Sequence, residues 1–234
     1  MKRISFVLLA SLMLGSCNAV EFATGEVIVK TITIGGEVDG IAASDGFDVV
    51  VDPTIPRGEV HVMTHTDLMD NVDIEVVGTT LNIDLNNWTM RAKTLKVKVP
   101  AYDFNAIAVS EGVDFEWHSC TVPSLSVAAS GGSDVEITAN SQEISIATSG
   151  GADVEMDGSC KHLTITASGG SDVDASKLLA EDVEVTTSGG ADVDVYATNS
   201  LRARASGGSD VRYGGNPKTK DIDSSGGADI KPAK

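Results

Sequence analysis

The chain is poor in the large side chains that fill most hydrophobic cores. Aromatic residues make up only 4% of its 234 residues, whereas glycine occurs 24 times. Burial must therefore come from valine, isoleucine, leucine and alanine packed in a thin layer. Because 41% of the residues are apolar, wholesale disorder is excluded, and a thin, layered fold is favoured over a thick globule.

Basic residues are also scarce. The sequence has 17 Lys and Arg against 34 Asp and Glu, which gives a formal net charge of −17. Such a surface repels nucleic acid and attracts cations or basic partners, so we expect no nucleic-acid partner. A purely solubilising role is the alternative explanation of this charge.

The N-terminus has the parts of an export signal. Met1-Lys2-Arg3 is positively charged, and the apolar run 4–14 is too short to span a bilayer. The run ends in Leu14-Gly15-Ser16-Cys17, which resembles the lipobox of bacterial lipoproteins. We therefore predict a signal peptide at 1–16 and a lipidated Cys17 with a tether at 17–35. An envelope protein anchored by lipid to the outer membrane follows. A chance cysteine near an ordinary cleavage site is the alternative.

One motif recurs through the second half of the chain. Ser130-Gly131-Gly132-Ser133-Asp134-Val135 has later copies from Ser149, Ser168, Ser188, Ser206 and Ser225, at steps of 19, 19, 20, 18 and 19 residues. Looser copies begin at Ser44 and Ser110. Repeats of this length are typical of solenoids, in which each repeat forms one coil.

The residues between the motifs alternate in polarity, as in 163–167, and this predicts strands with one buried side. Gly-Gly permits a tight bend, and the clusters Asn140-Ser141-Gln142 and Asp157-Gly158-Ser159 are expected to close the other end of each coil. We predict an all-β fold, namely a right-handed parallel β-solenoid (β-helix) with coils of about 19 residues over 101–234. A meander of antiparallel hairpins is the alternative, because it would show the same periodicity.

Two predictions follow from residue positions within the coils. Cys120 and Cys160 lie two coils apart, or about 9.6 Å, which exceeds the Cα separation of about 7 Å that a disulfide allows. We therefore expect two free thiols. The positions that flank Gly-Gly carry one hydroxyl residue and one alanine, which exchange places from coil to coil, as in Ala129 with Ser133 and Thr148 with Ala152. Both positions face inward, so each hydroxyl should bond to turn backbone.

Residues 36–100 contain strand-like runs without the motif, at 47–51, 59–64, 72–77, 80–85 and 94–99. Val77-Gly78-Thr79-Thr80 reads as a hairpin turn. We expect an irregular N-terminal β part that caps the solenoid.

The order of these segments resembles a known family. Its signature is carried by Gly46-Phe47-Asp48-Val49-Val50-Val51, Leu81-Asn82-Ile83 and Lys96-Val97-Lys98-Val99-Pro100, followed by the Ser-Gly-Gly-x-Asp-Val coils. This layout is similar to the domains named putative autotransporter adhesin head domains, which are common in Bacteroidota. The resemblance covers roughly residues 36–230. It implies a β-solenoid and brings no catalytic residues.

Two rows of acids are the strongest chemical candidates. Each motif continues as Asp-Val-acid, so both acids point outward, and stacking places equivalent acids near 5 Å. The rows comprise Asp114, Glu116, Asp134, Glu136, Asp153, Glu155, Asp172, Asp174, Asp192 and Asp194. Their repulsion requires relief, either by backbone N–H bonds as in Asx turns or by a bound cation such as Ca²⁺. In the last coils Arg212 and Lys231 should compensate Asp210 and Asp229.

No enzyme signature emerges, because a serine that recurs in every motif is better explained as a turn residue than as a nucleophile. We therefore expect a non-catalytic envelope lipoprotein whose acidic face serves adhesion or binds a carbohydrate, cation or protein partner. An envelope enzyme acting on polysaccharide and a structural spacer are the alternatives.

Overall fold

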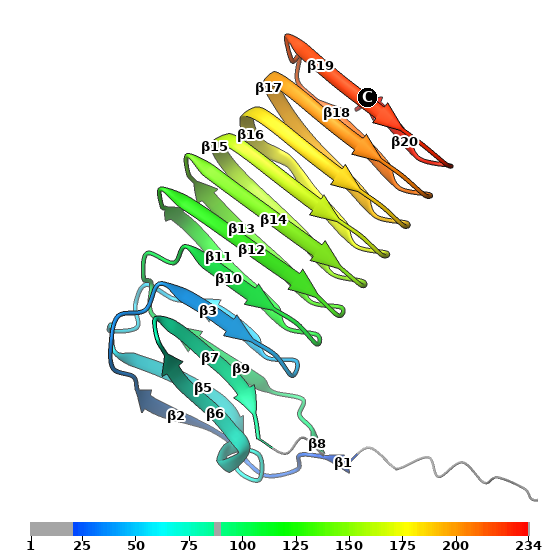
Figure 1. The fold of residues 1–234 in the computed structure, drawn as a ribbon. Helices are drawn as coiled ribbons and strands as arrows, with labels where there is room; N and C mark the ends of the chain where they lie inside the picture. Colours follow the sequence, from blue (N-terminus) through cyan, green and yellow to red (C-terminus); the bar gives the residue numbers. More distant parts are fainter. Residues whose placement is uncertain (1–20, 87–89, 234) are drawn as a thin grey trace, which may run out of the picture.

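The computed structural model describes residues 21–86 and 90–233, and its regular structure there is almost entirely β (Figure 1). Its helical content over the described residues is one short 3-10 helix, Met69–Asn71. No helix in this part of the chain has the length and apolar character needed to cross a membrane. The chain winds as a β-solenoid of about 7 turns with coils about 19 residues apart, which confirms the predicted fold.

Each regular coil contributes one strand segment to each of two parallel layers, which we call sheet A and sheet B. Three long strands turn the corner and serve both layers, namely β15 (Asp153–Ala167), β16 (Asp172–Thr187) and β17 (Asp192–Ala205). Sheet A otherwise contains β6 (Val72–Val77), β7 (Thr80–Leu85), β3 (Gly40–Ala43), β10 (Ala106–Val109), β12 (Ser124–Ser130), β14 (Glu143–Ser149) and β19 (Thr219–Ser224).

Sheet B lies on the other side of the core. Besides the first halves of β15, β16 and β17, it contains β2 (Val27–Thr33), β5 (Glu59–His65), β9 (Leu95–Val99), β4 (Asp48–Val51), β11 (Asp114–Thr121), β13 (Asp134–Asn140), β18 (Asp210–Gly214) and β20 (Asp229–Pro232). A separate pair joins β1 (Glu21–Phe22) to β8 (Met90–Arg91).

Equivalent residues stack directly in the core, as the constant repeat length predicts. Val135, Val154, Val173 and Val193 are register partners in successive coils, and each is almost fully buried. The outward neighbours of these residues are exposed or half-exposed, which is the pattern of a strand with one buried side. The core is therefore built from columns of like residues instead of a few large side chains.

The N-terminal part caps the solenoid with antiparallel strands. In sheet B, β9 pairs antiparallel with β5, and β5 pairs antiparallel with β2. In sheet A, β6 and β7 form the predicted hairpin, in which Val77 is opposite Thr80. Parallel stacking thus ends at β7 and β9, and the predicted irregular N-terminal β part is confirmed.

The predicted corner at Asp157-Gly158-Ser159 is not a separate turn. These residues lie inside the continuous strand β15, which pairs with β13 through Ser159 and with β14 from His162 onward. Gly158 has a φ of 115°, and a Cβ there would lie 2.0 Å from the oxygen of Ala139. The glycine therefore bends the strand around the corner, where its partner changes from β13 to β14. In the other predicted cluster, Asn140 is the last residue of β13, and Ser141 and Gln142 lie between β13 and β14.

The inward hydroxyls form pairs between adjacent coils. The hydroxyl oxygens of Thr148 and Ser171 are 2.8 Å apart, and those of Thr187 and Ser209 are 2.9 Å apart. Ser171 and Ser209 also donate to turn carbonyls, as predicted, whereas Thr148 and Thr187 bond to the serine hydroxyls and not to turn backbone. Each pair joins a threonine of one coil to a serine of the next coil. The arrangement of hydroxyl residue and alanine therefore repeats every second coil.

The hydroxyl of Ser133 is the exception. It is buried and has no hydrogen-bond partner among the described residues. Val109 occupies the strand-end position of the preceding coil, where Thr148 and Thr187 supply the partner hydroxyl in later coils. Ser133 therefore lacks the threonine partner that Ser171 and Ser209 have.

The Ser-Gly-Gly turns stack in register along one edge of the molecule, the right-hand edge in Figure 1. The N–H of Gly170 donates to the oxygen of Gly150 at 2.7 Å, and the N–H of Gly190 donates to the oxygen of Gly169 at 2.6 Å. Gly169 has a φ of 79°, in the left-handed region. A Cβ on it would lie 2.9 Å from the oxygen of Gly150. Stacking and backbone conformation thus both require glycine at the first turn position.

We expect Gly169→Ala to lower the free energy of unfolding by about 1–3 kcal/mol, because a side chain at positive φ is strained and would contact the coil before it. The matched control is Gly170→Ala. A Cβ at Gly170 has its nearest neighbour at 3.7 Å, so the change should stay within about 1 kcal/mol of the parent. Urea unfolding followed by circular dichroism measures both. Equal losses in the two variants would contradict the stacked-turn explanation.

Candidate functional site

The predicted acid rows exist as two ladders on the outer side of sheet B, which we call the acidic face. The first row places Asp114, Asp134, Asp153, Asp172 and Asp192 opposite one another in successive coils. The second row does the same for Glu116, Glu136, Glu155, Asp174 and Asp194. A shallow, open groove runs between the rows over four coils, with Phe115, Val135 and Val154 in its floor.

The first row extends beyond Asp114 and Asp192 at both ends. Asp48 pairs with Asp114 at one end, and Asp210 and Asp229 continue the row at the other. Beyond Asp48 the register partner is Lys96. Asp48 was missed as a site residue because its turn is only a loose copy of the motif. Its one available signal was the Gly-Phe-Asp-Val sequence after Asp45.

Basic residues close both ends of the acidic face. At the N-terminal end, the Lys96 ammonium lies 2.9 Å from Asp48, and the Lys98 ammonium lies 3.0 Å from Asp52. At the C-terminal end, Arg212 lies 3.5 Å from Asp194, and Lys231 lies 3.4 Å from Asp229. Arg212 also lies 3.9 Å from Asp210, so the predicted compensation of Asp210 and Asp229 is confirmed. Lys231 links adjacent coils as well, because it is 3.8 Å from Asp210.

One cation lies within the face. Lys177 donates to Glu155 at 2.6 Å, and its ammonium is 4.0 Å from Asp157. These carboxylates raise the pKa of Lys177. The pairing of β15 with β16 gains one residue between Glu155 and Gly158, and Lys177 lies in this bulge. The 20-residue step from Ser168 to Ser188 was the sequence signal of the extra residue.

The prediction of Asx turns in the first row is wrong. Within the described residues, no first-row aspartate among Asp114 to Asp192 accepts a backbone N–H bond; in the second row, Asp174 accepts one from Ser176 at 2.9 Å. The reason is that nearby N–H groups already serve the coil stack, since the N–H of Asp153 donates to Ser133 and that of Gly170 to Gly150. Much of the mutual repulsion is therefore left unrelieved.

The pKa values of two carboxyls record this repulsion and their partial burial. Burial, followed by the charges of Asp134, Asp48 and Glu116, raises the pKa of Asp114. Burial also raises the pKa of Asp194, although the Arg212 guanidinium opposes the shift. These carboxyls are less stable as anions in the folded chain than in water.

The described residues offer no preformed metal site. No group of three or more His, Cys, Asp or Glu side chains in this part of the chain is arranged to hold a metal ion. Along each acid row the carboxylates stand one strand spacing apart and project outward, so they do not converge on one point. The bound-cation explanation of the rows, including Ca²⁺, is therefore without support from their geometry.

Cys120 and Cys160 are free and buried, as predicted. Burial raises the pKa of each thiol to about 11, so both are protonated at neutral pH and are poor nucleophiles. The third cysteine, Cys17, lies outside the described residues, together with the predicted signal peptide 1–16. Of the predicted tether 17–35, the described part contains strands β1 and β2.

The outer side of sheet A differs from the acidic face in chemistry. Over the first regular coils its outward rows are alanine, serine and threonine, and they line a shallow depression. One row consists of Ala42, Ala108, Ala128, Ala147 and Thr166, which are register partners. The depression is therefore mostly uncharged, whereas the later coils of sheet A carry outward ion pairs such as Arg202 with Glu184 and Arg204 with Asp221.

The chain is a β-solenoid with repeated rows of surface residues, and its described part shows no assembled catalytic group. It belongs to the class of repeat proteins that present extended faces. The sequence of residues 37–217 matches the family described as "Putative auto-transporter adhesin, head GIN domain". The match covers most of the chain, so the protein belongs to this family. No curated protein matches the sequence.

Solved structures show the same fold. A putative adhesin from Bacteroides fragilis is 20% identical, with a TM-score of 0.81 over 90% of this chain and 99% of that one. A putative lipid binding protein from Parabacteroides distasonis is 18% identical, with a TM-score of 0.68 over 91% and 98% of the two chains. A putative adhesin from Parabacteroides merdae has the same TM-score of 0.68 at 14% identity, over 91% and 98%.

We expect Asp114→Asn to raise the free energy of unfolding at pH 7 by less than about 1 kcal/mol, because the charge is partly solvated. The folded-state pKa of Asp114 is raised, so the wild type loses stability as pH rises through that pKa, and the advantage of the amide vanishes in acid. Unfolding curves between pH 3 and 8 measure the difference.

Asp182→Asn is the control of opposite sign. Hydrogen bonds from Ser200 and Asn199 lower the pKa of Asp182, so its ionised form stabilises the fold at neutral pH, and this stability is lost as pH falls through the folded-state pKa. The control should therefore lower stability at pH 7. A destabilising effect of Asp114→Asn at pH 7 would contradict repulsion within the acid row.

Proposed function

We propose that the protein is a non-catalytic adhesion protein of the cell envelope, anchored through a lipid on Cys17, and that its acidic face binds a basic partner. The observation that carries the proposal is the ladder of carboxylates in register on one face of a rigid solenoid. Membership in a family described as adhesin heads supports an adhesive role.

The charge distribution favours a basic partner. First-row carboxylates such as Asp134 and Asp153 are exposed and form no ion pair within the described part of the chain. A cationic surface laid along the row would neutralise several at once, and relief of their mutual repulsion would add to the attraction. Such binding weakens as salt rises, since these charges face solvent.

The regular spacing favours an extended partner over a small ligand. The groove between the rows is shallow and open, so it encloses no small molecule. Equivalent acids recur at about 4.8 Å, the strand spacing of a sheet. A basic segment that lies along the solenoid axis can therefore contact several coils at once, and its affinity increases with the number of contacts.

The adhesion test uses cells that produce the chain with four first-row acids neutralised, namely Asp134→Asn, Asp153→Asn, Asp172→Asn and Asp192→Asn. We expect their adhesion to surfaces coated with basic protein to fall to the level of cells lacking the chain. None of the four side chains has an ion-pair or hydrogen-bond partner in the described part of the chain, so the fold should be preserved.

A control variant makes the same change in net charge elsewhere, with the exposed acids of Asp70→Asn, Glu75→Gln, Glu143→Gln and Glu181→Gln. It should adhere like the wild type at low salt. Equal adhesion of the two variants would show that net charge, and not the acidic face, determines binding.

The anchor has its own test. Cys17→Ala should abolish incorporation of labelled fatty acid and release the protein from the membrane fraction, because the thiol that carries the lipid is gone. Cys120→Ala, which removes a buried thiol, is the control and should remain membrane-bound and labelled. Labelled, membrane-bound Cys17→Ala protein would refute the lipid anchor.

A further inference from the structure

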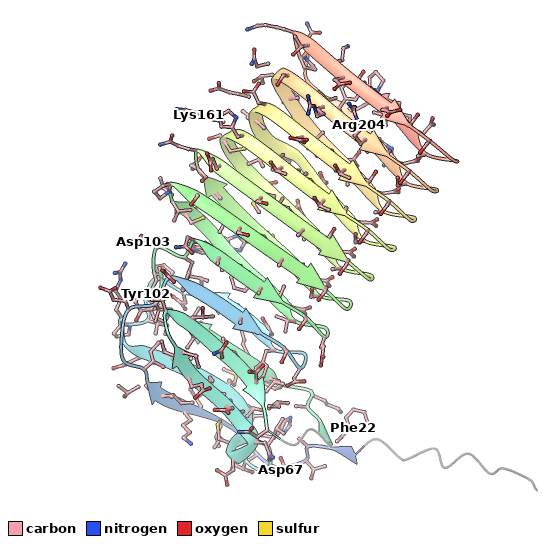
Figure 2. All side chains as sticks on the ribbon, in the orientation of Figure 1. Phe22, Asp67, Tyr102, Asp103, Lys161 and Arg204 are labelled. Atoms are coloured by element: carbon pink, nitrogen blue, oxygen red, sulfur yellow. The ribbon has the colours of Figure 1, made fainter. Side chains whose placement is uncertain are left out.

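We propose that the corner between the N-terminal part and the first regular coil is a binding site for a neutral sugar unit, centred on Arg57, Tyr102 and Asp103. This site is distinct from the acidic face and goes beyond the proposed function. Figure 2 shows Tyr102 and Asp103 at this corner, where the chain enters strand β10. A cavity of about 300 Å³ opens there.

The corner is built differently from the corners of later coils. Strand β11 has a register shift between Trp117 and Cys120, and Ser119 within it has a φ of 62°, in the left-handed region. A serine in this conformation is strained, and such positions are concentrated at ligand sites. The detour of the chain leaves space between β11 and the segment 101–103, and this space is the cavity.

A rigid aromatic cluster supports the cavity. Phe104 makes edge-to-face contacts with both Tyr102 and Trp117, at centroid distances of 5.7 and 5.4 Å. Phe104 and Trp117 are buried, whereas Tyr102 is half-buried and its hydroxyl accepts a hydrogen bond from the N–H of Gly58 at 2.9 Å. Packing against Phe104, which in turn packs on Trp117, fixes the Tyr102 ring, and this ring and Ala101 give the cavity a preorganised apolar wall.

The polar groups at the cavity mouth include both donors and an acceptor. The Arg57 guanidinium lies 5.1 Å from the centre of the Tyr102 ring and 3.9 Å from the Asp103 carboxylate. Their side chains are 62% and 85% exposed, and at this distance the pair forms only a weak ion pair. The fork of Arg57 and the oxygens of Asp103 are therefore available to a ligand.

The combination of groups selects the ligand class. An anion would be repelled by Asp103 and by the negative charge of the whole chain, and a cation would be repelled by Arg57. A neutral ring with several hydroxyls satisfies both side chains, because each hydroxyl can accept from Arg57 or donate to Asp103. The apolar side of such a ring suits the aromatic and alanine wall. These are the properties of a sugar unit.

The site has room for more than one sugar unit. A second hollow, bordered by Gly36 and Glu37, shares Arg57, Tyr102 and Asp103 with the first. Because these three residues line both hollows, one oligosaccharide can occupy both and contact all three side chains. The first cavity, at about 300 Å³, is near the lower end of the range for small-molecule sites, about 300–1,000 Å³, and the second, at about 560 Å³, lies within that range, so the two hollows suit a short glycan.

The test incubates the chain with an array of neutral, sialylated and uronate-containing oligosaccharides and then titrates it with the neutral glycan that binds best. Arg57→Gln and Asp103→Asn, made separately, should each weaken binding by about tenfold or more, since each removes charge-assisted hydrogen bonds to hydroxyls. The controls Arg202→Gln and Asp223→Asn change exposed charges on β17 and β19, away from both the corner and the acidic face, and should leave binding unchanged. Thermal unfolding confirms that each variant is folded.

Three outcomes would overturn the proposal: no neutral glycan binds, binding is unchanged in both corner variants, or the chain binds anionic glycans in preference to neutral ones. The first-row variant with four asparagines separates this proposal from the adhesion proposal. If it loses adhesion to basic surfaces but retains glycan binding, both proposals stand. If it loses glycan binding, the sugar lies on the acidic face and the corner is not the site.

Discussion

The backbone hydrogen bonds between coils hold most residues directly over their equivalents in the preceding coil, and the core and the acid rows both follow from this register. Inside, it aligns valine with valine, so a core with few aromatic residues still packs densely. Outside, it aligns aspartate with aspartate at the strand spacing of about 4.8 Å, where the charges repel. Core packing and surface repulsion are thus two consequences of the same geometry, and the packing of the core dominates.

The fold was predictable because it is periodic, whereas departures from the period were not. Six copies of one motif gave the coil length, the direction of each side chain and the two acid rows. The role of Lys177 depends on a single extra residue that shifts the register of β16, and the corner at Gly158 depends on a bend within a strand. The proposed sugar site depends on the bulge at Ser119, which has no counterpart in the repeated motif. The sequence therefore predicts the structure where one coil copies another, and it does not predict the features that occur in a single coil.

The failed prediction of Asx turns has a general physical reason. In an isolated turn, the N–H groups after Gly-Gly would be free to bond the aspartate side chain. In a solenoid the same N–H groups donate to the coil before, as Gly170 does to Gly150, so the side chain has no local donor. The carboxylates are left facing solvent, and their repulsion is met at the ends of the rows by Lys96 and Arg212. A partner that brings positive charge can therefore interact with groups that the fold itself leaves unpaired.

The paired hydroxyls constrain how a chain of this kind can change in length. Thr148 with Ser171, and Thr187 with Ser209, each need two consecutive coils of unlike type. Deleting or duplicating one coil within this region would bring a hydroxyl against an alanine, or two like coils against each other, and would leave a buried oxygen unsatisfied. Gain or loss of two coils together preserves every pair. The structural repeat of this region is thus a doublet of coils, twice the period of the repeated motif.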